Sequence, residues 1–372
     1  MKKIVFLIRS LNIGGAERQL VALAKGLHSR GVPVLVVVFY SNGPLENELQ
    51  IAGVPVAVLD KRGRWDVFHF FWRLLQLLRQ EKPDVLHGYL SVQNLLSVLI
   101  KPIFPSMRIV WGVRASNMDL DCYDWLFRLV FHGECFLSRF ADLIIVNSNA
   151  GKDYHQQHGF PERKMVVVPN GVDTKRFKPD PDARIRVRRE WKISDHEKLI
   201  GLVGRIDPMK DHATFLRAAA LLLQQRTDVR FVCIGDGPAS YKSKLLTLAS
   251  ELGIENNLIW AGARNDMTAV YTALDIASSS SLGEGFPNVI GEAMSCGVPC
   301  VVTDVGDSAW IVDDTGVVVP PQNPRALADG LELTLQRNNK SMAVRARKRV
   351  EENFGFDQLI EKTQKTLLNL VG

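Results

Sequence analysis

The chain has 372 residues, 46% of them hydrophobic and 23% charged, with a formal net charge of +6. This length exceeds one comfortable hydrophobic core, so two domains are expected, and the composition is ordinary for a globular protein. No apolar run reaches the roughly eighteen residues of a membrane-spanning helix, and the run 4–8 that follows the basic start is too short for a secretory leader. Five cysteines without a CxxC pair indicate reduced thiols in a cytoplasmic protein.

The positive charge is unevenly distributed. Residues 1–172 hold 20 Lys or Arg against 14 Asp or Glu, and the remaining residues hold 26 of each. This excess favours an anionic partner for the N-terminal half, either an anionic phospholipid surface or a phosphorylated acceptor, with a scattered solvated surface as the plain alternative. No basic cluster with interleaved aromatic residues is present, so a nucleic-acid partner is not expected.

The N-terminal half alternates apolar strands with amphipathic helices. Strands are predicted at 3–8, 34–39, 55–59, 84–87, 108–113, 142–147 and 165–168, and helices at 17–30, 44–52, 65–82, 91–101, 120–141 and 149–158. Repeated strand–helix units predict a doubly wound parallel sheet with ligands beyond the carboxyl ends of its strands. The loop of Gly14 and Gly15 after the first strand lacks GxGxxG, so no nicotinamide site is indicated.

Two side chains of this half are predicted at strand ends, where such a sheet places site residues. His87 closes the strand 84–87, and Arg114 follows the strand 108–113. We expect them to shape an acceptor pocket, or Arg114 to bind a phosphate, while a structural role for His87 is equally open. Asp119 and Asp121 match a DxD metal motif superficially, but they open a predicted helix, where acidic side chains favour the dipole, so no metal site is assigned.

Two predicted helices of this half are unusually apolar. The segment 65–79, WDVFHFFWRLLQLLR, keeps a narrow polar stripe, and 120–140 carries aromatic residues along its length. Packing against the sheet is one explanation. The other is a membrane-facing surface that reaches a lipid-linked acceptor, in which case the chain would bind the inner membrane face peripherally.

The C-terminal half repeats the alternation after a linker predicted at 179–182. Strands are predicted at 199–204, 230–235, 257–262, 276–280 and 298–303, and helices at 211–225, 240–252, 267–273, 288–295, 324–336, 341–352 and 356–370. The predicted domains are 1–172 and 173–355, followed by the segment 356–372.

Two cationic side chains follow the first strand of this half. In GLVGRIDPMKD the strand ends at Gly204 and is followed by Arg205, and Lys210 comes just before a helix. Arginine forks onto phosphate oxygens and lysine adds a point charge. Fixed cations of this kind stabilise a leaving diphosphate in the transition state and can replace a divalent metal. A solvated Arg and Lys pair is the plain alternative.

The stretch 278–304, SSSSLGEGFPNVIGEAMSCGVPCVVTD, is the most informative. Its glycine-rich turn leads into a helix with Pro287 in the first turn, which makes an anion site. Glu284 and Glu292 cannot both sit on a diphosphate, because like charges repel, but each could accept hydroxyl hydrogen bonds on either side of it. A nucleotide sugar offers that order of ribose, diphosphate and sugar. An ordinary capped loop with a solvated Glu is the plain alternative.

The motif EGFPNVIGE, two glutamates with seven residues between them, closely resembles the donor site of the group-1, glycogen-synthase-like glycosyltransferases of family 4. The resemblance covers nearly the whole chain. It implies the α/β GT-B fold, in which two Rossmann-like domains face each other across a cleft and the C-terminal helix crosses back to the first. It also implies retaining, metal-independent transfer of a hexose or N-acetylhexosamine from a nucleotide-diphosphate sugar, with a UDP-sugar as the expected donor and no cofactor.

The resemblance also implies roles for the matching residues. Arg205, Lys210 and Glu284 would be catalytic. Contacts with the donor would come from Gly15, Gly204, Arg205, Lys210, Arg264, Glu284, Phe286, Pro287, Asn288, Val289 and Glu292. Many relatives carry a His at the position of Arg114, so that role is not carried over, and the acceptor is expected to be a glycan or a lipid-linked sugar in surface-polysaccharide synthesis.

Two other functions would suit the same fold. A nucleotide-sugar 2-epimerase would need further acid/base carboxylates, and none stands out. An inactive scaffold that binds sugar nucleotides would not need the full set of Arg205, Lys210, Glu284 and Glu292.

Overall fold

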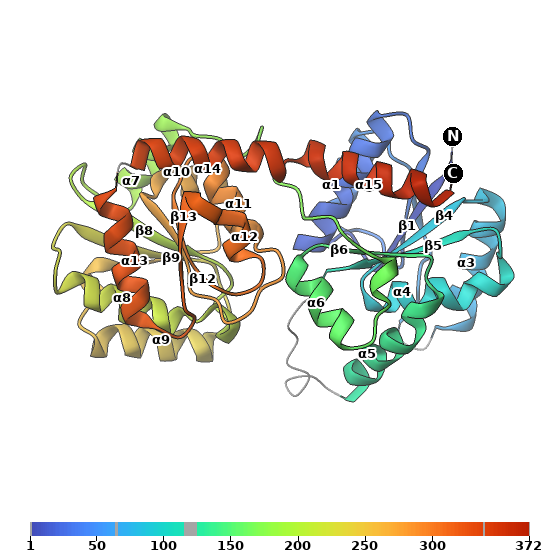
Figure 1. Ribbon diagram of the computed structural model, residues 1–372, viewed down its shortest axis with the longest axis horizontal. Coiled ribbons are helices and arrows are strands. Elements are labelled where there is room, and N and C mark those ends of the chain that lie inside the picture. Colours follow the sequence, from blue (N-terminus) through green and yellow to red (C-terminus); the bar gives the residue numbers. More distant parts are fainter. Residues whose placement is uncertain (1, 64–65, 115–124, 338, 372) are drawn as a thin grey trace. The chain divides into compact units, whose positions relative to one another are not determined.

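The computed structural model describes residues 2–63, 66–114, 125–337 and 339–371, which form two compact units. Unit 1 comprises Met1–Gly171 with Phe356–Gly372, and unit 2 comprises Val172–Gly355 (Figure 1). Each unit contains a parallel sheet with helices on its faces, so the predicted doubly wound α/β class is confirmed. The candidate DxD residues Asp119 and Asp121 lie outside the described residues.

Unit 1, in its described residues, has a seven-stranded parallel sheet in the order β3-β2-β1-β4-β5-β6-β7. Its strands are β1 (Ile4–Ile8), β2 (Val34–Val38), β3 (Val56–Val58), β4 (Val85–Tyr89), β5 (Arg108–Val113), β6 (Leu143–Val146) and β7 (Met165–Val167). The strands are continuously apolar because helices cover both faces of the sheet. The chain moves outward from β1 to β3 and returns on the other side as β4, so β1 and β4 flank the switch point where such folds bind ligands.

Two helical layers cover this sheet (Figure 1). The helices are α1 (Gly15–Ser29), α2 (Glu46–Ile51), α3 (Phe68–Glu81), α4 (Ser91–Ile100), α5 (Trp125–Leu137), α6 (Asn149–Gln157) and α15 (Phe356–Val371), with the 3-10 helices η1 (Lys101–Ile103), η3 (Ser138–Phe140) and η4 (Glu162–Lys164). Residues such as Phe6 face α1, α2 and α15, and alternate residues such as Leu7 face the layer of α3 to α6. No helix in the described part of the chain is both long and apolar enough to cross a bilayer.

The C-terminal helix α15 packs on α1 within unit 1. Leu359, Ile360 and Leu367 are buried in the same core as the inner face of α1. Gly26 on α1 makes room for this packing, since a Cβ there would lie 2.1 Å from Cδ1 of Ile360. Helix α15 therefore completes the core of the N-terminal unit.

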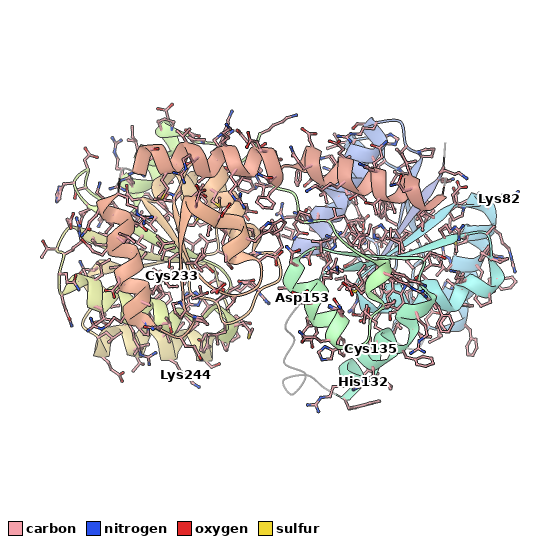
Figure 2. The ribbon with its side chains drawn as sticks, viewed as in Figure 1. Lys82, His132, Cys135, Asp153, Cys233 and Lys244 are labelled. Carbon is pink, nitrogen blue, oxygen red and sulfur yellow. The ribbon has the colours of Figure 1, made fainter. Side chains whose placement is uncertain are left out.

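Unit 2, in its described residues, has a six-stranded parallel sheet in the order β10-β9-β8-β11-β12-β13. The strands are β8 (Lys198–Val203), β9 (Val229–Ile234), β10 (Leu258–Gly262), β11 (Ile276–Ser279), β12 (Cys300–Thr303) and β13 (Gly316–Val319). The helices are α7 (Pro181–Glu190), α8 (His212–Leu223), α9 (Ala239–Glu251), α10 (Met267–Ala273), α11 (Asn288–Ser295), α12 (Ser308–Val312), α13 (Pro324–Gln336) and α14 (Asn339–Asn353), with the 3-10 helices η5 (Pro208–Lys210), η6 (Glu255–Asn257) and η7 (Asp313–Thr315). Cys233 on β9 is a buried thiol inside this unit (Figure 2).

Helix α7 is absent from the sequence prediction, which placed a linker at 179–182. The signals for it were present: the side chain of Asp180 accepts a hydrogen bond from the Ala183 N–H at 3.0 Å, and Pro181 is the first helical residue. The segment PDARIRVRRE was not predicted as a helix because its charged residues outnumber its apolar ones. The edge strand β13 was missed as well.

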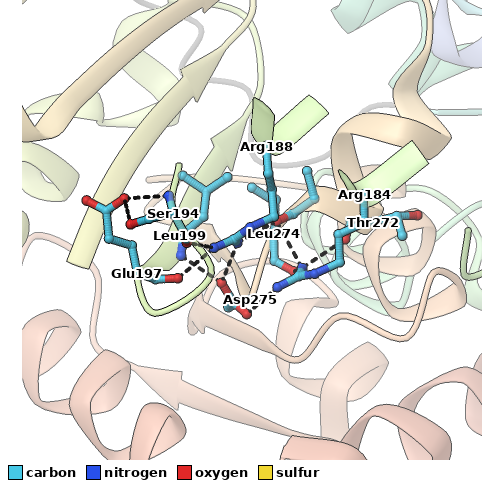
Figure 3. A network of polar contacts seen from close by, with 9 residues as sticks. Arg184, Arg188, Ser194, Glu197, Leu199, Thr272, Leu274 and Asp275 are labelled. Atoms are coloured by element: carbon cyan, nitrogen blue, oxygen red, sulfur yellow. Dashed lines mark hydrogen bonds and ion pairs between the residues drawn. The ribbon is translucent and has the colours of Figure 1, made fainter. Parts of the chain in front are cut away.

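The arginines of α7 bind a single aspartate in the interior of unit 2 (Figure 3). Arg188, only 6% exposed, donates to Asp275 Oδ2 at 3.0 Å, and Arg184 donates to Asp275 Oδ1 at 2.8 Å. Asp275 Oδ2 also accepts the Leu199 N–H at 2.8 Å. Further guanidinium bonds go to the carbonyls of Ser194, Glu197, Thr272, Ala273 and Leu274. Asp275 thus ties α7 to β8 and to the end of α10.

We predict that Asp275→Ala destabilises unit 2 by about 3–5 kcal/mol, because it leaves the buried guanidinium of Arg188 without its counter-ion. Hydrogen exchange resolved by peptide, which reports each unit separately, measures the effect on β8 and β9. Arg345→Ala is the matched control: Arg345 also pairs with an aspartate, but the two side chains are 52% and 74% exposed. Equal protection of β8 in the two variants would contradict the prediction.

Candidate functional site

The candidate site lies in unit 2 at the carboxyl ends of β8 and β11. The chain leaves β8 for β9 and β10 on one side and returns to β11 on the other, so these two neighbouring strands flank the switch point of the sheet. Gly204 and Arg205 follow β8, and the glycine-rich turn with Glu284 follows β11. The two strongest sequence motifs therefore meet at one edge of the sheet.

Backbone contacts join the loops that follow these two strands. The Leu282 N–H donates to the Met209 carbonyl at 2.8 Å. The Ser280 hydroxyl lies 2.9 Å from the carbonyls of both Lys210 and Asp211. These bonds fix the turn of η5, which carries Lys210, beside the glycine-rich turn.

Lys210 and Glu284 form an ion pair across the joined loops. Lys210 Nζ contacts Glu284 Oε1, and the Ser281 hydroxyl donates to the same oxygen at 2.7 Å. The two side chains are 23% and 12% exposed. The sequence suggested separate roles for them, whereas the structure brings them into contact. An ammonium group has three N–H donors, so Lys210 can hold Glu284 and a bound anion together.

Arg205 is exposed, and no hydrogen bond or ion pair joins its guanidinium to another residue in the described ranges. It follows Gly204, whose Cα lies against the Lys210 stem, since a Cβ there would be 3.4 Å from Lys210 Cγ. A planar guanidinium in this position can bind phosphate oxygens in pairs. Both predicted cations therefore stand in one loop after β8.

Two further glycines allow neighbouring backbones to approach the loops that follow β8 and β11. Gly235, at φ +141°, follows β9, and a Cβ there would lie 2.0 Å from the Gly204 carbonyl oxygen. Gly306, at φ +57°, follows β12, and its Cβ would lie 2.3 Å from the Glu284 carbonyl oxygen. Side chains at either position would push the two charged loops away from their neighbours.

Helix α11 brings Glu292 to the same edge. It begins at Asn288, with Pro287 as its N-cap rather than in its first turn, and its leading N–H groups lack helical acceptors. Glu292 Oε2 accepts a hydrogen bond from the Tyr271 hydroxyl at 2.8 Å. Burial, followed by the nearby Glu292 carboxylate, raises the pKa of Tyr271 well above its ordinary value, so Tyr271 stays a donor and orients Glu292. No sequence signal singled out Tyr271 on its helix.

Three side chains that were predicted to contact the donor contact other parts of unit 2 in the structure. Phe286 is 6% exposed, and its ring packs 5.6 Å from that of Phe354, so we assign this side chain to the core. Val289 packs partly buried against the same core. Arg264, after β10, binds Asp266 through two bonds of 2.8 Å and also pairs with Glu190, and these carboxylates raise its pKa. Its guanidinium is therefore already engaged.

His87 lies inside unit 1, not at its edge. The prediction that its strand ends there is wrong, because β4 continues to Tyr89. Its side chain is fully buried, and neither ring nitrogen has a hydrogen-bond partner among the described residues. Burial, with a smaller effect of Arg114, lowers the pKa of His87 well below its ordinary value, so the ring is neutral. A direct contact between this ring and a ligand is not supported.

Arg114 follows β5 as predicted and is held in place within unit 1. Its Nη1 donates to Asn170 Oδ1 at 3.0 Å and its Nη2 to the Tyr89 hydroxyl at 2.6 Å, with the guanidinium 4.6 Å from the centre of the Tyr89 ring. Neither partner was predicted as a site residue, although Asn170 stands in the motif VPNGVD. Gly15 is exposed as the first residue of α1.

Two family models match the chain in succession. A model described as Glycosyltransferase Family 4 matches residues 13–176, and one described as Glycosyl transferases group 1 matches residues 197–337. The first falls almost wholly in unit 1 and the second in unit 2. Together they cover the candidate site in unit 2 and most of unit 1.

Curated relatives are glycosyltransferases. The D-inositol 3-phosphate glycosyltransferase of Corynebacterium jeikeium is 35% identical over 202 residues, which are 51% of this chain and 48% of that protein. The UDP-Gal:alpha-D-GlcNAc-diphosphoundecaprenol alpha-1,3-galactosyltransferase of Escherichia coli is 23% identical over 311 residues, 80% of this chain and 78% of that protein. The chain spans about half the length of the first of these relatives.

Solved structures share the fold over nearly the whole chain. Anabaena Alr3699/HepE in complex with UDP superposes with a TM-score of 0.86 at 23% identity, covering 99% of this chain and 100% of that one. The same protein in complex with UDP-glucose superposes with a TM-score of 0.84. Two successive family models, the glycosyltransferase relatives and this fold agree: the chain belongs to the group-1 glycosyltransferases and has the GT-B fold.

Proposed function

We propose that the chain is a retaining glycosyltransferase that moves a hexose or N-acetylhexosamine from a UDP-sugar to a glycan or lipid-linked acceptor. The observation that carries the proposal is the Lys210–Glu284 ion pair between the loops after β8 and β11, with Arg205 in the first loop and Glu292 on the helix that follows the second. Two cations, two carboxylates and a helix N-terminus at one edge match a ligand that alternates hydroxyl groups with a diphosphate.

UDP is the proposed nucleotide because two of the similar proteins are described with it. The Anabaena structures contain UDP or UDP-glucose, and the Escherichia coli relative is named for a UDP-Gal donor. In the proposed pose, the diphosphate lies between Arg205, Lys210 and the first turn of α11. Glu292, oriented by Tyr271, accepts hydrogen bonds from the ribose, and Glu284 accepts them from the sugar.

The proposed chemistry needs cations more than it needs a base. The bond between the anomeric carbon and the diphosphate oxygen breaks, the acceptor oxygen bonds to that carbon on the same face, and its proton passes to the departing phosphate oxygen. The nucleoside diphosphate gains negative charge as the bond breaks. In the proposed pose Arg205 and Lys210 lie where that charge develops, so they would stabilise the transition state more than the ground state.

The acceptor is proposed to bind unit 1, in the cytoplasm or at its membrane face, during surface-polysaccharide or glycolipid synthesis. The names of the relatives include a phosphorylated inositol and a lipid diphosphate sugar, both of them anionic. Unit 1 carries the excess of basic residues, and Arg114 follows β5, near the switch point of its sheet. An arginine there would bind an acceptor phosphate.

Arg205→Ala and Lys210→Ala should each lower turnover by about 10²–10³-fold, since each removes one donor to the developing charge. The rate of UDP release in the presence of donor and acceptor measures the effect, with circular dichroism as the check on folding. Arg217→Ala, an exposed arginine on α8, is the matched control and should retain its rate. Wild-type turnover in a folded Arg205→Ala or Lys210→Ala variant would rule out the proposed role of that cation at the diphosphate.

Transfer should not need a divalent metal, because side chains supply the cations at the diphosphate. The expected result is an unchanged rate in excess chelator after dialysis of the protein. Loss of transfer that Mg²⁺ or Mn²⁺ restores would contradict this and direct attention to Asp119 and Asp121.

Substitution of each of the two glutamates should change the affinity for a different set of ligands. Glu292→Ala should weaken both UDP and the UDP-sugar by about ten- to a hundredfold, because both contain the ribose and a hydroxyl bond to a carboxylate contributes about 1.5–3 kcal/mol. Glu284→Ala should weaken the UDP-sugar but leave UDP almost unchanged. Calorimetric titration of both variants with both ligands measures this, with Glu251→Ala on the exposed side of α9 as control. If Glu284→Ala loses UDP as severely as Glu292→Ala, the donor lies the other way along the loop.

A further inference from the structure

Most of the large apolar side chains that unit 1 exposes lie on one helical layer, whereas Ile13, Ile51, Val166 and Leu368 are exposed singly elsewhere. We call this surface the α3–α5 face, and define it by Val67, Phe68, Trp72, Val92, Leu99, Ile103, Trp125, Leu129, Phe136 and Phe140. The most exposed are Phe68, at 90%, and Trp125, at 73%. In unit 2 the exposed apolar residues are instead spread singly over separate elements, as with Ile185 on α7 and Val344 on α14.

The outer side of α5 is mostly apolar, with His132 as its one polar member among the residues that follow. Trp125, Leu129, His132, Phe136 and Phe140 follow one another at intervals of three or four residues, so they form one stripe along α5 and η3. All five are exposed, and Figure 2 marks His132 on this helix. A helix on a protein surface ordinarily shows charged residues there. The inner side of α5 has its own buried residues, so core packing does not explain the stripe.

Helix α4 presents a second stripe beside the first. Val92, Leu99 and Ile103 are each more than 40% exposed and share one face of α4 and η1. The helices α4 and α5 pack against each other, and a Cβ added to Gly133 would be in ordinary contact with the Leu95 side chain at 3.8 Å. The two stripes therefore lie on neighbouring helices of one layer.

The charges on these helices are basic where they face solvent. Within α3, α4, η1, α5 and η3 the basic residues are Arg73, Arg79, Lys101, Arg128 and Arg139, and the acidic residues are Glu81 and Glu134. Neither acid is exposed: Glu134 is buried and hydrogen-bonded to Asn94, and Glu81 pairs with Lys3. The Arg139 guanidinium lies 4.5 Å from the centre of the Phe136 ring, which is a cation–π contact.

Two of these cations are partly neutralised by acids from outside the helices. Arg73 pairs with Asp60 at 3.0 Å, and Lys101 pairs with Asp142 at 2.7 Å. Arg79 and Arg139 are exposed cations on the same layer. Among the Lys, Arg, Asp and Glu residues described in α3, α4, η1, α5 and η3, these two arginines are the exposed ones.

We propose that the α3–α5 face docks on an anionic lipid bilayer. Its aromatic side chains would insert at the level of the headgroups, where Trp and Phe are favoured, and its arginines would lie against lipid phosphates. A second copy of the chain is the less favourable occupant. A two-fold interface would place this basic face against itself, with no exposed acid on these helices to balance it.

This inference goes beyond the transfer reaction and can be tested without donor or acceptor. The probe is a vesicle of phosphatidylglycerol and phosphatidylcholine in equal parts, compared with phosphatidylcholine alone, in a flotation assay. The wild-type chain should bind the anionic vesicles at low salt and lose affinity at high salt, since exposed charges are screened. Its tryptophan emission should be quenched by brominated lipid, because Trp72 and Trp125 lie on the docking face.

Trp125→Ala with Phe136→Ala should lower vesicle affinity by about tenfold or more, because each aromatic ring removed loses apolar burial. Phe68→Ala with Trp72→Ala tests the α3 part in the same way, and Arg79→Gln with Arg139→Gln should mainly reduce the dependence on salt. The control is Ile185→Ala with Val344→Ala, two comparably exposed apolar residues of unit 2, which should bind as the wild type does.

Three results would overturn the proposal. The first is a wild-type chain that ignores anionic vesicles at low salt. The second is an unchanged affinity in both aromatic double variants, with their fold confirmed by circular dichroism. The third is a wild-type dimer in vesicle-free solution that Trp125→Ala with Phe136→Ala dissociates, which would assign the face to a second copy.

Discussion

The close approach of two backbones at the carboxyl ends of β8 and β11 is the constraint on which the candidate site depends. The Met209–Leu282 hydrogen bond and the double contact of the Ser280 hydroxyl hold the two loops together. Only because of this closeness can Lys210, from one loop, pair with Glu284, from the other. The glycines after β9 and β12 leave room for neighbouring carbonyls, so backbone geometry places the charges before any ligand binds.

That placement explains why a diphosphate suits the site electrostatically. Glu284 offsets part of the Lys210 charge, whereas the exposed Arg205 guanidinium has no such counter-ion among the described residues. Glu292 stands on α11 instead and is oriented by a tyrosine that burial keeps protonated. The two carboxylates thus have different partners and need not repel a phosphate placed between them, which supports distinct roles for them in the proposed reaction.

Motifs at strand ends could be predicted from the sequence, because glycine, proline and charge act locally there; the loops of Arg205 and Glu284 were found in this way. Partners supplied from elsewhere in the fold could not, since nothing near Tyr271 or Asn170 in the sequence points to Glu292 or Arg114. Burial could not be predicted either: sheet pairing encloses the His87 side chain, whose structural role the sequence left open, and the Phe286 ring packs on Phe354.

The central claim, that the β8–β11 edge of unit 2 binds the diphosphate of a nucleotide sugar, is tested most directly by a crystal structure of the chain with an intact UDP-sugar. The account predicts both phosphates within hydrogen-bond distance of Arg205, Lys210 and the first N–H groups of α11, with the ribose hydroxyls on Glu292. Density for the diphosphate at another strand edge, or phosphates that contact neither Arg205 nor Lys210, would contradict it.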